Sequence, residues 1–174
     1  MSALEELQKC YNDHELGVKE WRKAGGNIIM GYTCETTPEE LLYAGGILPV
    51  RIVGDPAEEI VDAWKYYDDY STPVVGGMLE AYLKGKYDYL DGWLMARSND
   101  GATLLYYNFL GFHEITPRNL FWIDVPHVQG HRQFDWMVSE LERLKQSLEE
   151  TFHIIITDFS LTRAIDIYNE NRRL

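Results

Sequence analysis

The sequence predicts an α/β fold, a short parallel sheet of about four strands flanked by helices in a Rossmann-like layout, with helices at both ends of the chain. Short apolar runs bounded by glycine or proline alternate with amphipathic stretches, which is the pattern of strands and helices around a parallel sheet. With 174 residues the chain has the length of one domain, so we expect a single α/β domain over residues 1–174.

The first two elements are predicted to be a helix and a buried strand. The apolar residues within residues 4–24 follow helical spacing, and Gly25 and Gly26 end the pattern. Residues 27–32 then form an apolar run bounded by glycine, which is typical of a strand that is buried in a parallel sheet.

A short capped helix and a peripheral strand are predicted next. We expect Thr37 to cap the helix, with Pro38 at its first position and Glu40 completing a capping box. Residues 47–53 predict the second strand. We place it at the periphery of the sheet because Pro49 cannot donate a hydrogen bond to a ladder.

The rest of the chain continues the alternation. Helices are predicted over residues 56–67, 78–83, 102–109 and 130–152, strands within residues 89–95 and 120–125, and a loop over residues 68–73. The helix at residues 130–152 is the clearest, because its apolar residues step by three or four positions. A last helix is expected where Leu161, Ala164 and Tyr168 share one face.

Composition excludes several classes of partner. Sixteen basic and 28 acidic side chains give a net charge of −12, which argues against nucleic acid and anionic membranes, although not against a small phosphate-bearing ligand. No apolar stretch approaches the roughly 18 residues of a membrane-spanning helix. Two cysteines, Cys10 and Cys34, are too few for a disulfide scaffold, and the start of the chain lacks a signal-peptide core. We therefore expect a reduced, cytoplasmic protein.

Candidate site residues follow the predicted strands, because ligands usually bind at the carboxyl edge of a parallel sheet. Cys34 is a candidate thiolate ahead of a helix N-terminus or, alternatively, a small half-buried residue without chemistry. Glu39 and Glu40 are candidate bases for a substrate α-carbon or, alternatively, first-turn acids of the helix.

Histidines and basic residues supply further candidates. His127 and His131 are spaced like metal ligands on a helix, whereas Gly130 between them favours a polar loop. Four cations are candidates for the phosphates of a ligand or, alternatively, ordinary surface charges: Arg51, Lys84, Lys86 and Arg97.

Five stretches, in this order and spacing, resemble the 2-hydroxyacyl-CoA dehydratase and benzoyl-CoA reductase family. They are Gly31-Tyr32-Thr33-Cys34, the run from Pro38 to Ile52, the run from Gly85 to Gly92, Ile123-Asp124-Val125-Pro126-His127, and the run from Ala164 to Arg173. The resemblance covers nearly the whole chain, yet only the N-terminal half of the family's subunits, which carry a second α/β domain.

The resemblance implies reductive chemistry on CoA thioesters. In the family, three cysteines per subunit bind a [4Fe–4S] cluster, which receives an electron from a separate ATP-dependent activator. The iron without a protein ligand can then meet the substrate thioester, which explains why three thiolates are used rather than four.

The chain departs from the family at two of the three cluster positions. Cys34 matches the first ligand, whereas Thr72 stands before Pro73 where the second cysteine is expected, and Asn99 replaces the third. Cys10 is a poor substitute because it lies early in the first predicted helix. Three interpretations stay open: a non-catalytic subunit beside a cluster-bearing partner, a cluster with unusual ligands, or a diverged paralog with another role.

The first interpretation gives the leading functional hypothesis. We expect a component of a CoA-thioester dehydratase or reductase system, without a standard cluster, that pairs with a homologous subunit as a homodimer or heterodimer and helps to frame an acyl-CoA site. The alternative is a non-redox module that binds a protein or a small ligand. Aromatic residues proposed for an interface are Tyr66, Tyr67, Tyr70, Tyr106 and Tyr107.

Overall fold

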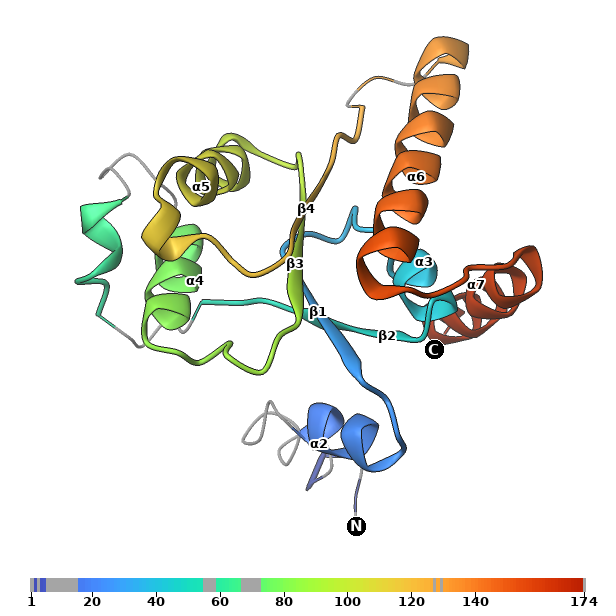
Figure 1. Ribbon diagram of the computed structural model, residues 1–174, viewed down its shortest axis with the longest axis horizontal. Coiled ribbons are helices and arrows are strands. Elements are labelled where there is room, and N and C mark those ends of the chain that lie inside the picture. The colour runs from blue at the N-terminus through green and yellow to red at the C-terminus, as the bar shows by residue number, and fades with distance from the viewer. Residues whose placement is uncertain are drawn as a thin grey trace.

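The computed structural model describes residues 2, 4–5, 16–54, 59–66, 73–126, 128 and 130–173 and contains a parallel four-stranded sheet (Figure 1). The strands are β1 (Ile28–Tyr32), β2 (Ile47–Arg51), β3 (Gly92–Ala96) and β4 (Leu120–Ile123), in the order β2-β1-β3-β4. The predicted α/β class and the count of four strands are confirmed, and every pair in the sheet is parallel.

Burial follows the position of each strand in the sheet. The central strands β1 and β3 are almost wholly buried, whereas β2 and β4 form the two edges. Pro49 of β2 lies opposite Met30 of β1, and its missing N–H does no harm because β2 has a neighbour on one side only. The peripheral placement of the second strand is therefore confirmed.

Helices cover both faces of the sheet. They are α2 (Leu16–Lys23), α3 (Glu39–Ala44), α4 (Pro73–Leu83), α5 (Asp100–Gly111), α6 (His131–Phe152) and α7 (Asp158–Arg173), with 3-10 turns at Ala63–Lys65 and His113–Ile115. In Figure 1, α4 and α5 lie on one side of the sheet and α3, α6 and α7 on the other. Among the described residues, no helix is both long and apolar enough to cross a membrane.

Two apolar cores hold these layers together. On the α6 face, Leu144 and Leu148 pack with Leu94 and Ile123 of the sheet. On the opposite face, Trp93 is almost fully buried, and the edges of aromatic rings from α4 and α5 meet it at centroid distances of 5.4 and 5.5 Å. Removal of this apolar surface from water is the main force that closes the two layers on the sheet.

The predicted helix boundaries were wrong around the fourth helix. The helix predicted over residues 78–83 begins at Pro73, which the sequence assigns to a loop. Proline is tolerated in the first turn of a helix, so Pro73 does not prevent an earlier start. Helix α4 is also buried along most of its length, so its sequence lacks the alternation of polar and apolar faces from which amphipathic helices are predicted.

The helix predicted over residues 56–67 is also wrong in its described part. Residues 59–62 are not helical, and only Ala63–Lys65 forms a 3-10 turn. The carboxylate of Glu80 on α4 holds this segment by accepting hydrogen bonds from the backbone N–H groups of Val61 (3.1 Å) and Ala63 (2.8 Å). Residues 55–58 and 67–72, like residues 6–15 of the predicted first helix, lie outside the described part of the chain.

The capping box predicted for α3 does not form. Pro38, not Thr37, occupies the N-cap, and the buried hydroxyl of Thr37 has no hydrogen-bond partner among the described residues. Glu40 instead forms an ion pair with Arg172 of α7. The reason is a tertiary contact. Helix α7 packs against α3, where the rings of Tyr43 and Tyr168 meet edge to face at a centroid distance of 5.9 Å. In this arrangement the Glu40 carboxylate binds Arg172 and does not bond back to the start of α3.

Candidate functional site

A cavity of about 410 Å³ lies at the carboxyl edge of the sheet, where β1, β2 and β3 end. Its apolar wall comes from Ile52, Val75, Met78, Met95 and Leu105, and its polar groups include Thr33, Cys34, Arg51, Ser98 and Asn99. The first turns of α4 and α5 border it through Val74 and Ala102. Arg51 and the first turns of the two helices contribute positive charge, and Glu35, which also lines the cavity, contributes a negative charge, so the cavity offers polar groups of both signs beside an apolar wall.

Cys34 is the nucleophilic side chain of this cavity. It follows β1 in a turn that is closed by a hydrogen bond of 3.0 Å from the Thr37 N–H to the Cys34 carbonyl oxygen. Partial burial of the thiol raises its pKa most, but hydrogen bonds from Ser98 and from the side chain and backbone of Thr36 together hold the pKa below its ordinary value. These hydrogen bonds stabilise the thiolate form of Cys34 relative to that of an ordinary cysteine, while its role as a reactive thiolate stays a prediction.

Asn99 lines the same cavity, but its side chain caps a helix. It is the N-cap of α5, where its Oδ1 atom accepts a hydrogen bond of 2.8 Å from the backbone N–H of Ala102. Its amide nitrogen is 3.5 Å from the Ser98 hydroxyl. The oxygen that could face a ligand is thus already committed to the first turn of α5.

The structure brings together positions that the resemblance assigns to cluster ligands. Cys34 and Asn99 line one cavity although 65 positions separate them in the chain. Thr72 lies outside the described residues, while Val74, two positions further on, lines the same cavity. Within the described part of the chain, no group of three His, Cys, Asp or Glu side chains could hold a metal ion. A single thiolate beside a committed asparagine does not fit a cluster held by three thiolates.

Glu39 and Glu40 lie apart from this cavity. Glu39 forms a hydrogen bond with Tyr32, and burial together with this carboxylate raises the pKa of the Tyr32 hydroxyl well above its usual range. Glu40 is paired with Arg172. Neither glutamate lines the cavity that contains Cys34, so their role as bases stays a prediction.

The candidate cations separate into two groups. Arg51 lines the Cys34 cavity, and Arg97 lines a neighbouring cavity at the same edge of the sheet. Lys84 is 3.0 Å from Glu80 and follows the end of α4, so it lies with Lys86 near the opposite edge. His131 is the first residue of α6, whereas His127 and Cys10 lie outside the described residues.

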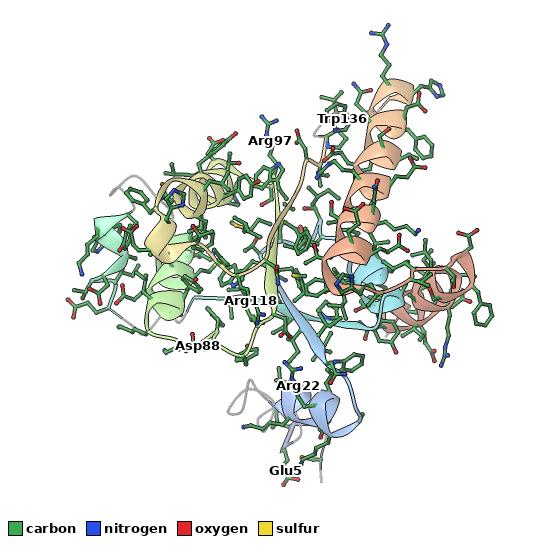
Figure 2. The ribbon with its side chains drawn as sticks, viewed as in Figure 1. Glu5, Arg22, Asp88, Arg97, Arg118 and Trp136 are labelled. Atoms are coloured by element: carbon green, nitrogen blue, oxygen red, sulfur yellow. The ribbon has the colours of Figure 1, made fainter. Side chains whose placement is uncertain are left out.

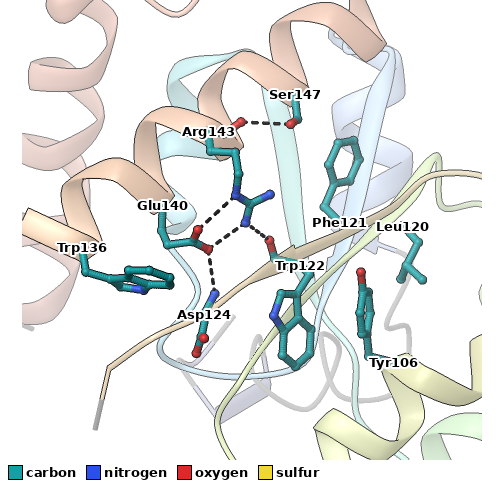
Figure 3. A pocket seen from close by; sticks show the side chains of 9 residues that line it. All are labelled: Tyr106, Leu120, Phe121, Trp122, Asp124, Trp136, Glu140, Arg143 and Ser147. Atoms are coloured by element: carbon teal, nitrogen blue, oxygen red, sulfur yellow. Dashed lines mark hydrogen bonds and ion pairs between the residues drawn. The ribbon is translucent and has the colours of Figure 1, made fainter. Parts of the chain in front are cut away.

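Figure 3 shows a second cavity, of about 480 Å³, between the outer edge of β4 and α6. Arg143 of α6 donates hydrogen bonds to both carboxylate oxygens of Glu140, at 3.1 and 2.7 Å. The ring of Tyr106 stacks on Trp122 with a centroid distance of 4.4 Å. The sequence analysis missed this ion pair; its signal was opposite charges three positions apart beside the apolar face of α6.

The comparison with known families decides the ancestry of the chain. Residues 34–174 match the model of the family "2-hydroxyglutaryl-CoA dehydratase, D-component". The chain belongs to this family. The match covers every residue that lines the Cys34 cavity except Thr33, the α3–α7 contact and the whole of α6, and it confirms the resemblance inferred from the sequence motifs.

Characterised relatives carry the same kind of name. The chain is 30% identical to the (R)-phenyllactyl-CoA dehydratase beta subunit of Clostridium sporogenes, over 79% of this chain and 36% of that protein. It is 26% identical to a benzoyl-CoA reductase subunit of Thauera aromatica, over 100% of this chain and 46% of that protein. A third relative, the (R)-2-hydroxyglutaryl-CoA dehydratase subunit beta of Acidaminococcus fermentans, is 27% identical over 98% of this chain and 45% of its own length. The chain thus spans less than half the length of these relatives.

Proposed function

We propose that the chain is a component of a 2-hydroxyacyl-CoA dehydratase or benzoyl-CoA reductase-like system, holds no standard [4Fe–4S] cluster, and pairs with a homologous, cluster-bearing subunit. One observation carries the proposal: Cys34 and Asn99 line a common cavity at the positions of two family ligands, but only one of them offers a thiolate. The relatives are named as subunits of systems that act on CoA thioesters, which supports a partner of the same kind.

The residues of the cavity support a binding role better than a redox role. Its apolar wall, formed in part by Met78, Met95 and Leu105, suits an acyl group, while Arg51 at the rim can meet a carboxylate or carbonyl oxygen. A cytoplasmic location fits this proposal because CoA thioesters are intracellular metabolites. The cluster chemistry then belongs to the partner.

Iron analysis tests the proposal directly. The chain is prepared anaerobically, and its iron, its acid-labile sulfide and its visible spectrum are measured with and without the co-purified partner. We expect a colourless chain with far less than one iron and a brown complex whose iron belongs to the partner. About four irons on the isolated chain would overturn the cluster-free assignment, and a chain that recovers no cluster-bearing partner would overturn the pairing.

A gain-of-function variant sharpens this test. The double variant T72C/N99C restores the three family thiolates, and we expect it to take up about four irons per chain in anaerobic reconstitution. The matched control is T72S/N99S, which changes the same positions without adding thiolates and should remain colourless. Equal uptake by both variants would show that the two missing thiolates are not what excludes the cluster.

The second candidate is a non-redox module that binds a protein or a small ligand. The N-cap role of Asn99 favours it, because a former ligand position has been turned into a structural one. This candidate predicts a melting temperature that does not respond to acyl-CoAs. A rise of several degrees on addition of an acyl-CoA would count against it, since a ligand of the native state stabilises that state.

A further inference from the structure

Aromatic side chains gather around the cavity of about 480 Å³ at the outer edge of β4. Tyr106, Trp122 and Trp136 form part of its wall. Next to it, the ring of Tyr107 lies 5.8 Å from the ring of Tyr106 and is 61% exposed. Trp136 is 52% exposed and projects from α6 near the carboxyl edge of the sheet (Figure 2). These four side chains form what we call the aromatic face, a hollow with an exposed ring beside it.

Helix α5 adds an uncovered apolar side to the aromatic face. After Asp100 the helix has no charged side chain, and its residues Leu105 and Phe109 lie in the core. Tyr107 and Leu110 are exposed on its other side, three positions apart, so they are neighbours on the helix surface. A helix that is apolar on all sides is normally buried on all sides. The described part of the chain leaves this side of α5 open, which suits a contact with another protein molecule.

The charges around the cavity cancel, in contrast to those of the whole chain. Arg143 is 2.7 Å from Glu140, and Arg97 is 3.5 Å from Asp124. The chain carries a net charge of −12, so two copies repel each other unless they meet at a neutral surface. A basic partner would gain little here, because the cavity offers it no surplus of acidic groups. The charge pattern therefore favours a second copy of this chain as the occupant.

A contact around a two-fold axis uses the same surface on both molecules, so that surface has to be complementary to itself. The aromatic face meets this condition, because it presents the exposed ring of Tyr107 beside a cavity. A cavity of this size accommodates molecules larger than one phenol ring. Tyrosine, tryptophan and arginine are also the residues that dominate binding at the centres of protein interfaces.

We propose that the aromatic face is a two-fold interface between two copies of this chain, in which the Tyr107 ring of each copy enters the cavity of the other beside Trp136. The Arg143–Glu140 pair in the cavity wall can bond the phenol hydroxyl there. The interface goes beyond the proposed function, which concerns a different, cluster-bearing subunit.

Sedimentation velocity over a range of concentrations tests the interface. We expect the 174-residue chain to pass from one copy to two between about 1 and about 100 µM. Y107A and W136A should each raise the dissociation constant about tenfold or more. The matched control is F159A, which removes an aromatic ring that is 80% exposed on α7, on the other side of the sheet, and should associate as the parent does. Melting temperatures show whether each variant is folded.

A mixture of Y107A and W136A tests whether the two side chains meet across the axis. In the mixed pair, one contact keeps both the ring and the intact cavity, and the other contact lacks both. Once the ring is absent, loss of Trp136 has little further effect, so the mixed pair should be tighter than the pair that either variant forms alone. If the mixture associates as weakly as each variant alone, Tyr107 does not enter the cavity of the other copy and the proposal is refuted.

Salt separates a second copy from a partner of opposite charge. Each copy carries a net charge of −12, and salt screens the repulsion between them. We therefore expect self-association of the parent chain to strengthen severalfold between about 50 and about 500 mM NaCl. Association that weakens with salt would depend on ion pairs between the copies, which the neutral aromatic face does not provide, and would overturn the proposal.

The interface and the proposed function fail separately. Iron content and recovery of a cluster-bearing partner test the proposed function and do not depend on self-association. A parent chain that stays monomeric at about 100 µM refutes the two-fold interface, whatever partner is recovered. The interface is also refuted if Y107A and W136A prevent recovery of the homologous subunit but leave self-association unchanged, since the aromatic face then belongs to that subunit.

Discussion

Arg143 of α6 donates a hydrogen bond of 2.8 Å to the backbone carbonyl oxygen of Trp122, on the side of β4 that faces away from the sheet (Figure 3). The adjoining Glu140 carboxylate accepts a hydrogen bond of 3.1 Å from the backbone N–H of Asp124 at the end of the same strand. An unpaired strand edge is a template for association with other strands. This ion pair therefore satisfies two backbone groups at the exposed edge of β4 and holds α6 against it.

Loss of Arg143 should weaken this edge. We expect R143M to lower the free energy of unfolding by about 1–2 kcal/mol, because it removes hydrogen bonds between charged groups that are only partly shielded from water. It should also increase light scattering on standing, since the Trp122 carbonyl becomes free. Urea unfolding of R143M is compared with R163M, an exposed change on α7 that should shift stability by no more than about 0.5 kcal/mol. Equal effects of the two variants would contradict this role.

Thr37 offers a test of the failed capping box. Its buried hydroxyl lacks a partner among the described residues, so T37V should raise the free energy of unfolding by about 1 kcal/mol. A functioning capping box would make the same change destabilising by a similar amount. The sign of the change in urea unfolding therefore separates the two structures.

The control for T37V is a box that does form. Thr157 and Ser160 exchange hydrogen bonds of 3.1 Å between side chains and backbone N–H groups at the start of α7. T157V should therefore lose about 1 kcal/mol. Stabilisation by both valine variants would mean that neither threonine acts as a cap.

These two helix starts show how far local sequence predicts the fold. The alternation of apolar runs was sufficient for the parallel sheet, its count of strands and the edge position of Pro49, since these depend on period and proline chemistry alone. The capping box at Thr37 matched the motif and failed because Arg172, far away in the chain, binds Glu40. The box at Thr157 was overlooked because serine replaces the usual glutamate. The first turns of the buried helix α4 were not predicted for a related reason: a helix without a polar face has no amphipathic periodicity in its sequence.

The site was predictable in its position and not in its chemistry. Strand ends indicated the carboxyl edge, and the motifs pointed to Cys34 and Asn99, which the structure brings into one cavity. Nothing in the local sequence shows that the oxygen of Asn99 caps α5, or that Arg97 and Trp136 line one cavity. Contacts such as the second join segments more than 30 positions apart, and only the packed sheet brings them together.

Glu80 should make the protein sensitive to acid. Burial opposes its charge most strongly, but the backbone N–H groups of Ala63 and Val61 and the ammonium of Lys84 together lower its pKa below the ordinary value. A carboxylate with a lowered pKa in the folded state stabilises the fold above its unfolded pKa of about 4.3 and loses this effect as the pH falls further. We expect E80Q to be about 2 kcal/mol less stable than the parent at pH 7.

The difference between E80Q and the parent should shrink below about pH 5, as the parent carboxylate takes up a proton. Urea unfolding at several pH values gives this difference directly. The control is E142Q, an exposed change on α6 whose effect should stay small at every pH. A gap for E80Q that stays constant down to pH 3 would show that its carboxylate is not held ionised.

The thiol of Cys34 should titrate below the pH of an ordinary cysteine. Its hydrogen bonds from Ser98 and Thr36 favour the thiolate and outweigh the effect of burial. In a C10S background, which leaves Cys34 as the sole thiol, the rate of alkylation by iodoacetamide should therefore rise at lower pH than in the same chain unfolded in urea.

Ser98 should help to determine the pH at which the thiol of Cys34 ionises. S98A removes one of the hydrogen bonds that favour the thiolate, so the midpoint of the pH–rate profile should move to higher pH and the rate near neutrality should fall. The matched change S139A removes a hydroxyl on α6 that donates a hydrogen bond to the carbonyl of Asp135, and it should leave the profile unchanged. If S98A lowers the rate equally at every pH, the serine controls access to Cys34 and not its ionisation, because ionisation alone cannot alter the rate once the thiol is fully deprotonated.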